Sequence, residues 1–256
     1  MKKYFKLLLV LSISSTYLIS KDIKNNIEAI NIAGKQRMLT QKILKEYAMI
    51  GMNNKFGEPI LSLKESVNDF DIALKFLSKF NKDKKCKKEL SSTKILWLKT
   101  KKIVEDKPSL DNATKLQNIL DKLLSNSDRI TKIFIKNSKS KSVEIINIAG
   151  KERMYSQKLA SLYMLKVWGI KDKQFDIKME ETIKSFKESL NKLEKYPKNT
   201  DAINKLIKST KKAFLFFDIM SKSKSKFIPS LIYKKSLEIL NNMDTIVSLY
   251  AKIEHK

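Results

Sequence analysis

A thirteen-residue segment that occurs twice constrains this chain more than any other feature of its sequence. Residues 30–42 read INIAGKQRMLTQK and residues 146–158 read INIAGKERMYSQK, so ten of thirteen positions are identical at a spacing of 116 residues. The spacing is the same near the end of each copy, where LLSNSDRITKIF from Leu123 aligns with ILNNMDTIVSLY from Ile239. A fixed long period is the signature of repeated structural units. The sequence therefore predicts a tandem duplication.

The pattern of apolar residues predicts that each unit is made of helices alone. Only five glycines and four prolines interrupt 256 residues, and apolar side chains recur at steps of three and four residues, the period of an amphipathic helix. Four such helices with short connections fit an up-down-up-down four-helix bundle. The predicted fold is all-α, a tandem pair of these bundles over residues 21–138 and 139–256. In the first unit we expect helices over residues 21–52, 59–80, 87–105 and 110–136.

The segment at residues 137–142 decides how the two units are arranged. Its sequence, NSKSKS, is compatible with a turn and with a helix that continues from one unit into the next. A turn would start the second motif helix beside the first, because the fourth helix of an up-down bundle ends at the pole where the first began. A continuous helix would stack the units end to end. The sequence leaves both arrangements open.

The first twenty residues have the pattern of an export signal. Three lysines precede an apolar run from Leu7 to Ile19, which is shorter than the roughly 20 apolar residues of a membrane span. We expect residues 1–20 to be a signal peptide, in preference to a short N-terminal anchor. The protein would then be periplasmic, or attached to the membrane if the signal is not cleaved. No later segment is apolar enough to predict a span.

The strong positive charge does not predict a nucleic-acid-binding protein. The net charge is +26, but fifty of the 53 basic residues are lysines, spread along the chain without a long basic block. The only histidine, His255, is the penultimate residue, and the chain has no glycine-rich phosphate loop. We therefore expect no enzymatic activity, no cofactor and no metal site. The only cysteine, Cys86, lies in KDKKCKKEL, which we expect to be an exposed turn.

One face of the repeated motif carries a glycine followed one turn later by an arginine. Glycine inside a helix costs about 0.5–1 kcal/mol relative to alanine, so it indicates a close helix or space for a ligand. The chain has only three arginines, and the third, Arg129, lies outside the motif. Because lysine supplies nearly every other positive charge, the motif arginines indicate a need for the planar guanidinium fork, which binds oxyanions through two parallel hydrogen bonds. The glutamine one turn after each arginine shares this face and is a further candidate donor.

A structural role for the arginines is the alternative. Each arginine would then pair with a carboxylate of its own bundle. Glu28 and Glu144 are candidates, although nine residues along a helix is too far for a direct pair. Asn31 and Asn147 are as consistent with hydrogen bonds between packed helices as with contacts to a ligand.

The pattern IN-AG--RM-(S/T)Q near the start of a long exported helix resembles the N-terminal domain of type IV pilus methyl-accepting chemotaxis transducers (PilJ-like). It is also similar to the P-box of nitrate/nitrite sensor kinases (NarX-like). The resemblance implies a periplasmic four-helix bundle that dimerises and holds one anion between the two P-box arginines. Two copies in one chain would form a pseudo-dimer within a monomer. The resemblance implies Arg37 and Arg153 as ligand-binding residues, with Gly34, Gly150, Ile30 and Ile146 lining the site. Gln41 and Gln157 join them as candidate donors because they share the arginine face.

The sequence thus predicts an exported sensor that recognises a small anion such as nitrate or nitrite between the two motif helices. Because the chain ends without a signalling domain, we expect a membrane receptor or transducer as its partner. The alternative is a non-catalytic helical module that docks a membrane chemoreceptor or a pilus-linked signalling protein. The two readings differ in whether Arg37 and Arg153 approach each other across a cavity or each meet a carboxylate. Glu152, where the first copy has Gln36, would disfavour an anion only if it faced the arginines.

Overall fold

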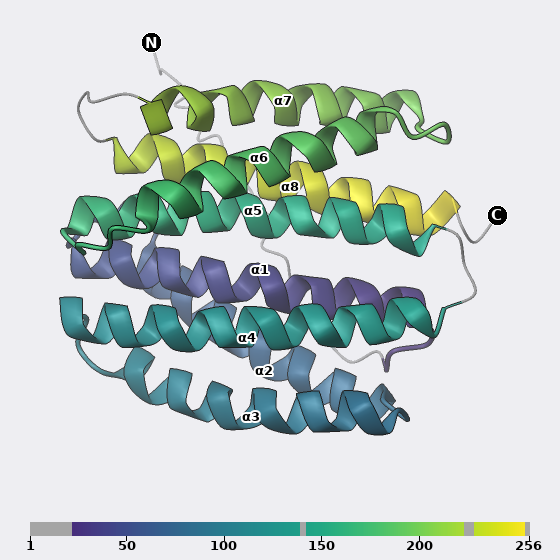
Figure 1. Ribbon diagram of the computed structural model, residues 1–256, viewed down its shortest axis with the longest axis horizontal. Helices are drawn as coiled ribbons and strands as arrows, with labels where there is room; N and C mark the ends of the chain where they lie inside the picture. The colour runs from purple at the N-terminus through teal and green to yellow at the C-terminus, as the bar shows by residue number, and fades with distance from the viewer. Residues whose placement is uncertain (1–21, 139–141, 223–227, 254–256) are drawn as a thin grey trace, which may run out of the picture.

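The computed structural model describes residues 22–138, 142–222 and 228–253, and every regular element in these ranges is a helix. The all-α prediction is confirmed. Figure 1 shows two groups of four helices that meet along α1 and α5. The first group is α1 (Asn26–Gly51), α2 (Pro59–Phe80), α3 (Lys84–Glu105) and α4 (Leu110–Lys136). The second is α5 (Val143–Trp168), α6 (Phe175–Glu194), α7 (Asp201–Lys222) and α8 (Pro229–Ile253).

Helices α1 and α5 lie side by side in the middle of the molecule (Figure 1). Lys45 Nζ donates to Gln157 Oε1 at 2.9 Å, and Ser161 Oγ donates to Gln41 Oε1 at 3.4 Å. These partners are 112 and 120 residues apart in the chain, on either side of the 116-residue spacing. Nearer the start of both helices, Arg37 bonds to Asn147 and Arg153 bonds to Asn31, so the contacts advance in the same direction along α1 and α5. The two helices are therefore parallel, with equivalent residues at similar height. The units pack side by side and do not stack end to end.

Side-chain caps set the start of two helices. Helix α1 begins at Asn26, later than predicted, because Asn25 is extended and its side chain accepts from the backbone N–H of Glu28 at 3.0 Å. Helix α3 begins earlier than predicted, because Asp83 accepts from the backbone N–H of Cys86 at 3.0 Å. Helices α2 and α4 have the predicted bounds.

The expectation that Cys86 lies in an exposed turn was wrong. The early start of α3 places this residue in the first helical turn, and its side chain is fully buried in the apolar core. Burial raises the pKa of the thiol to about 12, so the thiolate is not formed at neutral pH.

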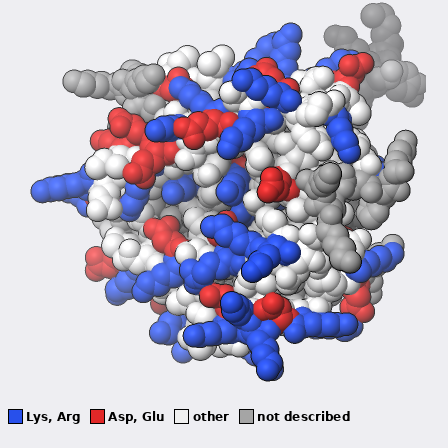
Figure 2. All heavy atoms as spheres, turned by 45° about the vertical axis from the view of Figure 1, so that its right-hand side comes forward, with Lys and Arg blue, Asp and Glu red and all other residues white. Residues whose placement is uncertain are grey.

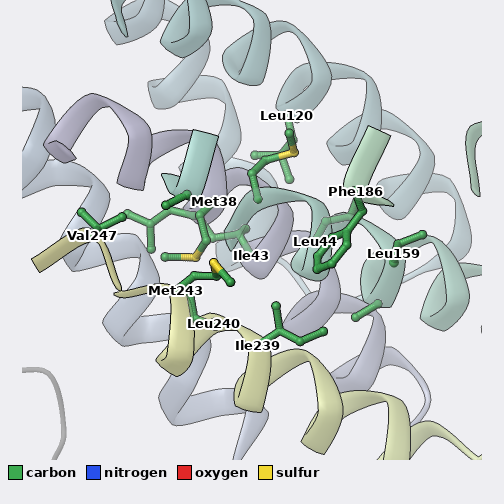
Figure 3. Close-up of a cluster of buried hydrophobic side chains, with 14 of the residues drawn as sticks. Met38, Ile43, Leu44, Leu120, Leu159, Phe186, Ile239, Leu240, Met243 and Val247 are labelled. Atoms are coloured by element: carbon green, nitrogen blue, oxygen red, sulfur yellow. The ribbon is translucent and has the colours of Figure 1, made fainter. Parts of the chain in front are cut away.

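One apolar core extends through both groups of helices. Figure 3 shows side chains of α1, α4, α5, α6 and α8 that meet within it, including Met38 and Met243. Met154, the counterpart of Met38 in the second motif, is also buried. Because the core continues from one group into the other, separating them would expose apolar surface, at a cost of roughly 25 cal/mol per Å².

Each group contains an equivalent stacked aromatic pair between its second and third helices. Phe70 of α2 stacks on Trp97 of α3, and Phe186 of α6 stacks on Phe214 of α7, with ring centroids 4.0 Å apart in both pairs. The α2 and α6 members differ by 116 residues, whereas the α3 and α7 members differ by 117. The sequence predicts a constant spacing of 116 residues between equivalent positions. The spacing is instead 117 residues between these positions of the third helices, α3 and α7.

An ion pair between the second and third helices of each group has opposite polarity in the two groups. Lys101 of α3 pairs with Asp71 of α2 at 3.0 Å. In the second group, Lys187 of α6 pairs with Asp218 of α7, also at 3.0 Å. Lys187 is thus the counterpart of Asp71, 116 residues later, and Asp218 is the counterpart of Lys101, 117 residues later. The two charges have exchanged helices between the groups.

On the face drawn in Figure 2, lysine and arginine side chains are spread widely, with acidic side chains among them. Within the part of the chain that the structure describes, none of the helices has the length and apolar character needed to cross a membrane. The predicted signal peptide at residues 1–20 lies outside the described residues.

Candidate functional site at the interface of the two motif helices

The two motif arginines meet beside the two motif glycines, where α1 packs against α5. A Cβ atom added to Gly34 would lie 3.3 Å from Arg37 Nη2 and 3.5 Å from Arg153 Nη2. A Cβ atom on Gly150 would lie 3.3 Å from Arg153 Nη2 and 3.6 Å from Arg37 Nη2. The two guanidinium groups therefore share one small space. An alanine methyl group at either position would be tight against the arginine of its own helix and in ordinary contact with the other arginine, so glycine leaves room for both guanidinium groups.

Each motif arginine is also paired with an aspartate of its own group. Arg37 Nη1 donates to Asp128 of α4 at 2.7 Å, and Arg153 Nη1 donates to Asp244 of α8 at 2.6 Å. Glu28 and Glu144, the partners considered from the sequence, do not form these pairs. The aspartates are themselves 116 residues apart, within the two aligned segments that begin at Leu123 and Ile239. This equivalence was the signal by which the sequence could have identified them.

Burial and the charge of the partner shift the pKa values of Arg37 and Asp128 in opposite directions. Desolvation lowers the pKa of the Arg37 guanidinium, Asp128 opposes this effect, and the nearby charge of Arg153 adds to the lowering. Burial also opposes ionisation of Asp128, but the hydrogen bond from Lys132 and the charge and hydrogen bond of Arg37 outweigh it, and the pKa of this carboxyl lies below its ordinary value. The Asp128 carboxylate is therefore ionised at neutral pH.

The motif asparagines connect the two groups crosswise. Arg37 Nη2 donates to Asn147 Oδ1 of α5 at 2.7 Å, and Arg153 Nη2 donates to Asn31 Oδ1 of α1 at 2.9 Å. Of the two roles that the sequence left open for these asparagines, the structure shows hydrogen bonds between packed helices. Each arginine thus joins the fourth helix of its own group to the first helix of the other group.

One edge of each guanidinium group still has an unused donor. The Nε atoms of Arg37 and Arg153 are buried and have no hydrogen-bond partner among the described residues. Nε–H and one hydrogen of Nη2 point from the same edge of a guanidinium group, which is an edge that holds an oxyanion through two parallel bonds. The two arginines are 1% and 2% exposed, so an anion that reached them would be bound with little solvent screening.

This motif lies within a segment that matches a known family. Residues 18–123 match the family model described as type IV pili methyl-accepting chemotaxis transducer N-term, PilJ. The first unit is PilJ-like. The matched segment contains Gly34 and Arg37 and ends before Asp128. No curated protein and no solved structure shows a significant match to the chain.

The remaining motif residues of the PilJ-like unit and its counterpart are buried in the same interface. Ile30 and Ile146 are each 1% exposed and belong to the core. Gln157 accepts from Lys45 Nζ and donates to the backbone oxygen of Ser236 at 3.0 Å. Gln41 is buried as well. The structure thus places all eight predicted residues along one interface, with the glutamines engaged in protein hydrogen bonds.

The PilJ-like motif and its copy differ at one buried position. Glu152 faces α6, where Ser189 donates a hydrogen bond to its carboxyl group, and does not face the arginines. Complete burial raises the pKa of Glu152 well above its ordinary value, and the hydrogen bond from Ser189 only partly opposes this shift. Gln36 is buried at the equivalent place with no partner for its amide among the described residues.

A pocket of about 510 Å³ opens beside Arg37 of the PilJ-like unit, between α1, α4, α5 and α6. We call it the Arg37 pocket; its walls include Arg37, Gln41, Gln117 and Lys151, but not Arg153. Among the described residues, no three His, Cys, Asp or Glu side chains come together as a metal site.

Proposed function

We propose that this protein is an exported sensory module that binds a small anion, of the size of nitrate or nitrite, between Arg37 and Arg153. The observation that carries the proposal is the convergence of both guanidinium groups on one space beside Gly34 and Gly150. The match to a transducer N-terminal family supports the sensory role of the first unit.

Binding would act on the hydrogen bonds that hold α1 and α5 together. Each Nη2 atom donates to an asparagine of the opposite group, so an anion on the Nε and Nη2 edges competes with these two contacts. The anion would also relieve the repulsion between the arginines. A change in the relative position of α1 and α5 is then the signal that a membrane-bound transducer receives.

The docking reading also has an observation in its favour. Asp128 and Asp244 already balance the charge of the two arginines, as expected for side chains with a purely structural role. Near the loop between α1 and α2, Phe56, Ile60 and Leu61 are large apolar side chains that are about half exposed (45%, 59% and 51%). These side chains are where a protein partner would bind if the arginines hold no ligand.

Thermal unfolding in the presence of nitrate, nitrite, chloride and acetate at fixed ionic strength tests the proposal. An anion at about 100 times its dissociation constant stabilises the folded state by roughly 2.7 kcal/mol. We expect a shift for nitrate or nitrite that is lost in Arg37→Lys/Arg153→Lys, because lysine keeps the charge and removes the fork. Arg129→Lys is the matched control, since Arg129 is the third arginine and its side chain is about half exposed. If no anion shifts the transition of the folded wild type, the anion reading is wrong and the docking reading is favoured.

A further inference from the structure

In the second group, a tyrosine occupies the position equivalent to Gln117 in the wall of the Arg37 pocket. Gln117 of α4 lines the pocket and is 6% exposed, and its amide has no hydrogen bond to any described residue. The residue 116 positions later is Tyr233 of α8, which is 2% exposed. Its ring centroid lies 4.0 Å from Lys45 Nζ, and its hydroxyl oxygen lies 3.1 Å from both Glu46 Oε1 and the backbone oxygen of Gly57, the two acceptors for its single hydrogen. The tyrosine thus reaches from α8 across to α1.

One end of the Arg37 pocket is cationic. Arg37, Lys151 and Asp128 line it. Asp128 is already paired with Arg37 and Lys132, whereas Lys151 forms no ion pair within the described part of the chain. Burial lowers the pKa of Lys151, Asp128 opposes the shift, and Arg37 and Lys132 add to it. Positive charge at this end is therefore only partly compensated. A ligand carboxylate placed here would relieve this excess.

The floor and the opposite end of the pocket have a different chemistry. Leu44, Met154 and Leu162 line it and are buried. At the opposite end, Lys158 and Lys178 act on Asp121, so charges of both signs are already close together there. The volume of about 510 Å³ is within the range of about 300–1,000 Å³ for small-molecule sites. It is much larger than an inorganic anion needs.

We propose that the Arg37 pocket binds a small organic carboxylate, with the carboxylate group at Arg37 and Lys151 and the apolar part against Leu44, Met154 and Leu162. The inference rests on the proposed sensory function and adds the ligand class and the asymmetry. One chain with two similar motifs would hold one organic ligand, because Tyr233 fills the second place.

Isothermal titration of the protein with benzoate tests this inference, with benzyl alcohol as the uncharged analogue. We expect saturable binding of benzoate and at least tenfold weaker binding of benzyl alcohol. Lys151→Gln should weaken benzoate at least tenfold. Lys35→Gln is the matched control at the equivalent place in α1, where Lys35 pairs with Asp69 at 3.0 Å, and should leave benzoate affinity unchanged.

A second variant tests the pocket itself. Gln117→Tyr introduces the residue of the closed half and should abolish benzoate binding while the protein remains folded by circular dichroism. It should leave the nitrate shift unchanged, because the arginine pair lies on the α1/α5 interface. Absence of benzoate binding by the folded wild type, equal effects of Lys151→Gln and Lys35→Gln, or binding that persists in Gln117→Tyr would each overturn the inference. A nitrate shift that is present without benzoate binding would refute the pocket alone, and the reverse result would refute the arginine site alone.

Discussion

Replacing the aspartate partners of the buried arginines should destabilise the protein in an order set by exposure. Arg37 is 1% exposed and its Nη1 lies 2.7 Å from Asp128, whose side chain is 27% exposed. Asp128→Asn keeps an oxygen acceptor but removes the charge that balances a buried guanidinium group. A hydrogen bond to a charged group contributes about 1.5–3 kcal/mol, and a buried charge without its partner costs at least as much. We expect a loss of about 1.5–3 kcal/mol in the free energy of unfolding.

The equivalent change in the second group should cost less. Arg153 is 2% exposed, but the side chain of Asp244 is 44% exposed, so water screens this pair more strongly. We expect Asp244→Asn to cost about 0.5–1.5 kcal/mol. Asp176→Asn is the control, because Asp176 is 73% exposed in its pair with Lys166 and should change stability by no more than about 0.5 kcal/mol.

Urea denaturation at pH 7, followed by circular dichroism, measures these differences. If Asp128→Asn and Asp244→Asn both match the control, the buried arginines do not depend on these carboxylates and the electrostatic account of the site is wrong. If Asp244→Asn costs more than Asp128→Asn, exposure does not determine the strength of the two pairs.

Three further changes test other parts of the protein. Burial lowers the pKa of Lys45 to about 8. Between about pH 8 and 10.5 the unfolded chain therefore binds more protons than the folded protein, and the free energy of unfolding should rise with pH. Urea titrations should show this rise in the wild type and not in Lys45→Met, and the same pH dependence in both proteins would contradict the shift. Burial raises the pKa of Glu152, so the free energy of unfolding should fall as pH rises above about 4.3. Glu152→Gln should remove that decline. If the variant keeps the pH profile of the wild type, Glu152 is not its cause. A Cβ atom at Gly51 would lie 2.0 Å from Trp168, so Gly51→Ala should cost about 1–3 kcal/mol, and a stabilised variant would show that the tryptophan moves freely.

The fold was predictable because helix signals are local. The apolar period and the proline at the start of α2 determine its bounds, and the repeated motif places both arginines on one face. The partners of those arginines are 91 residues away in the chain, and helical periodicity contains no information about contacts at that distance. The burial of Cys86 was missed because a lysine-rich segment looks exposed, although only one face of its helix is. The difference between Gln117 and Tyr233 has meaning only once the pocket is known.

The reversed ion pairs described above bear on how the chain avoids misassembly. Two similar four-helix units in one polypeptide can exchange helices during folding. If α2 paired with α7, Asp71 would face Asp218, and if α6 paired with α3, Lys187 would face Lys101. Both exchanged arrangements place like charges in contact, whereas both native arrangements place opposite charges there. The exchange of lysine and aspartate between the copies therefore marks each helix for its own unit, which two identical copies could not achieve.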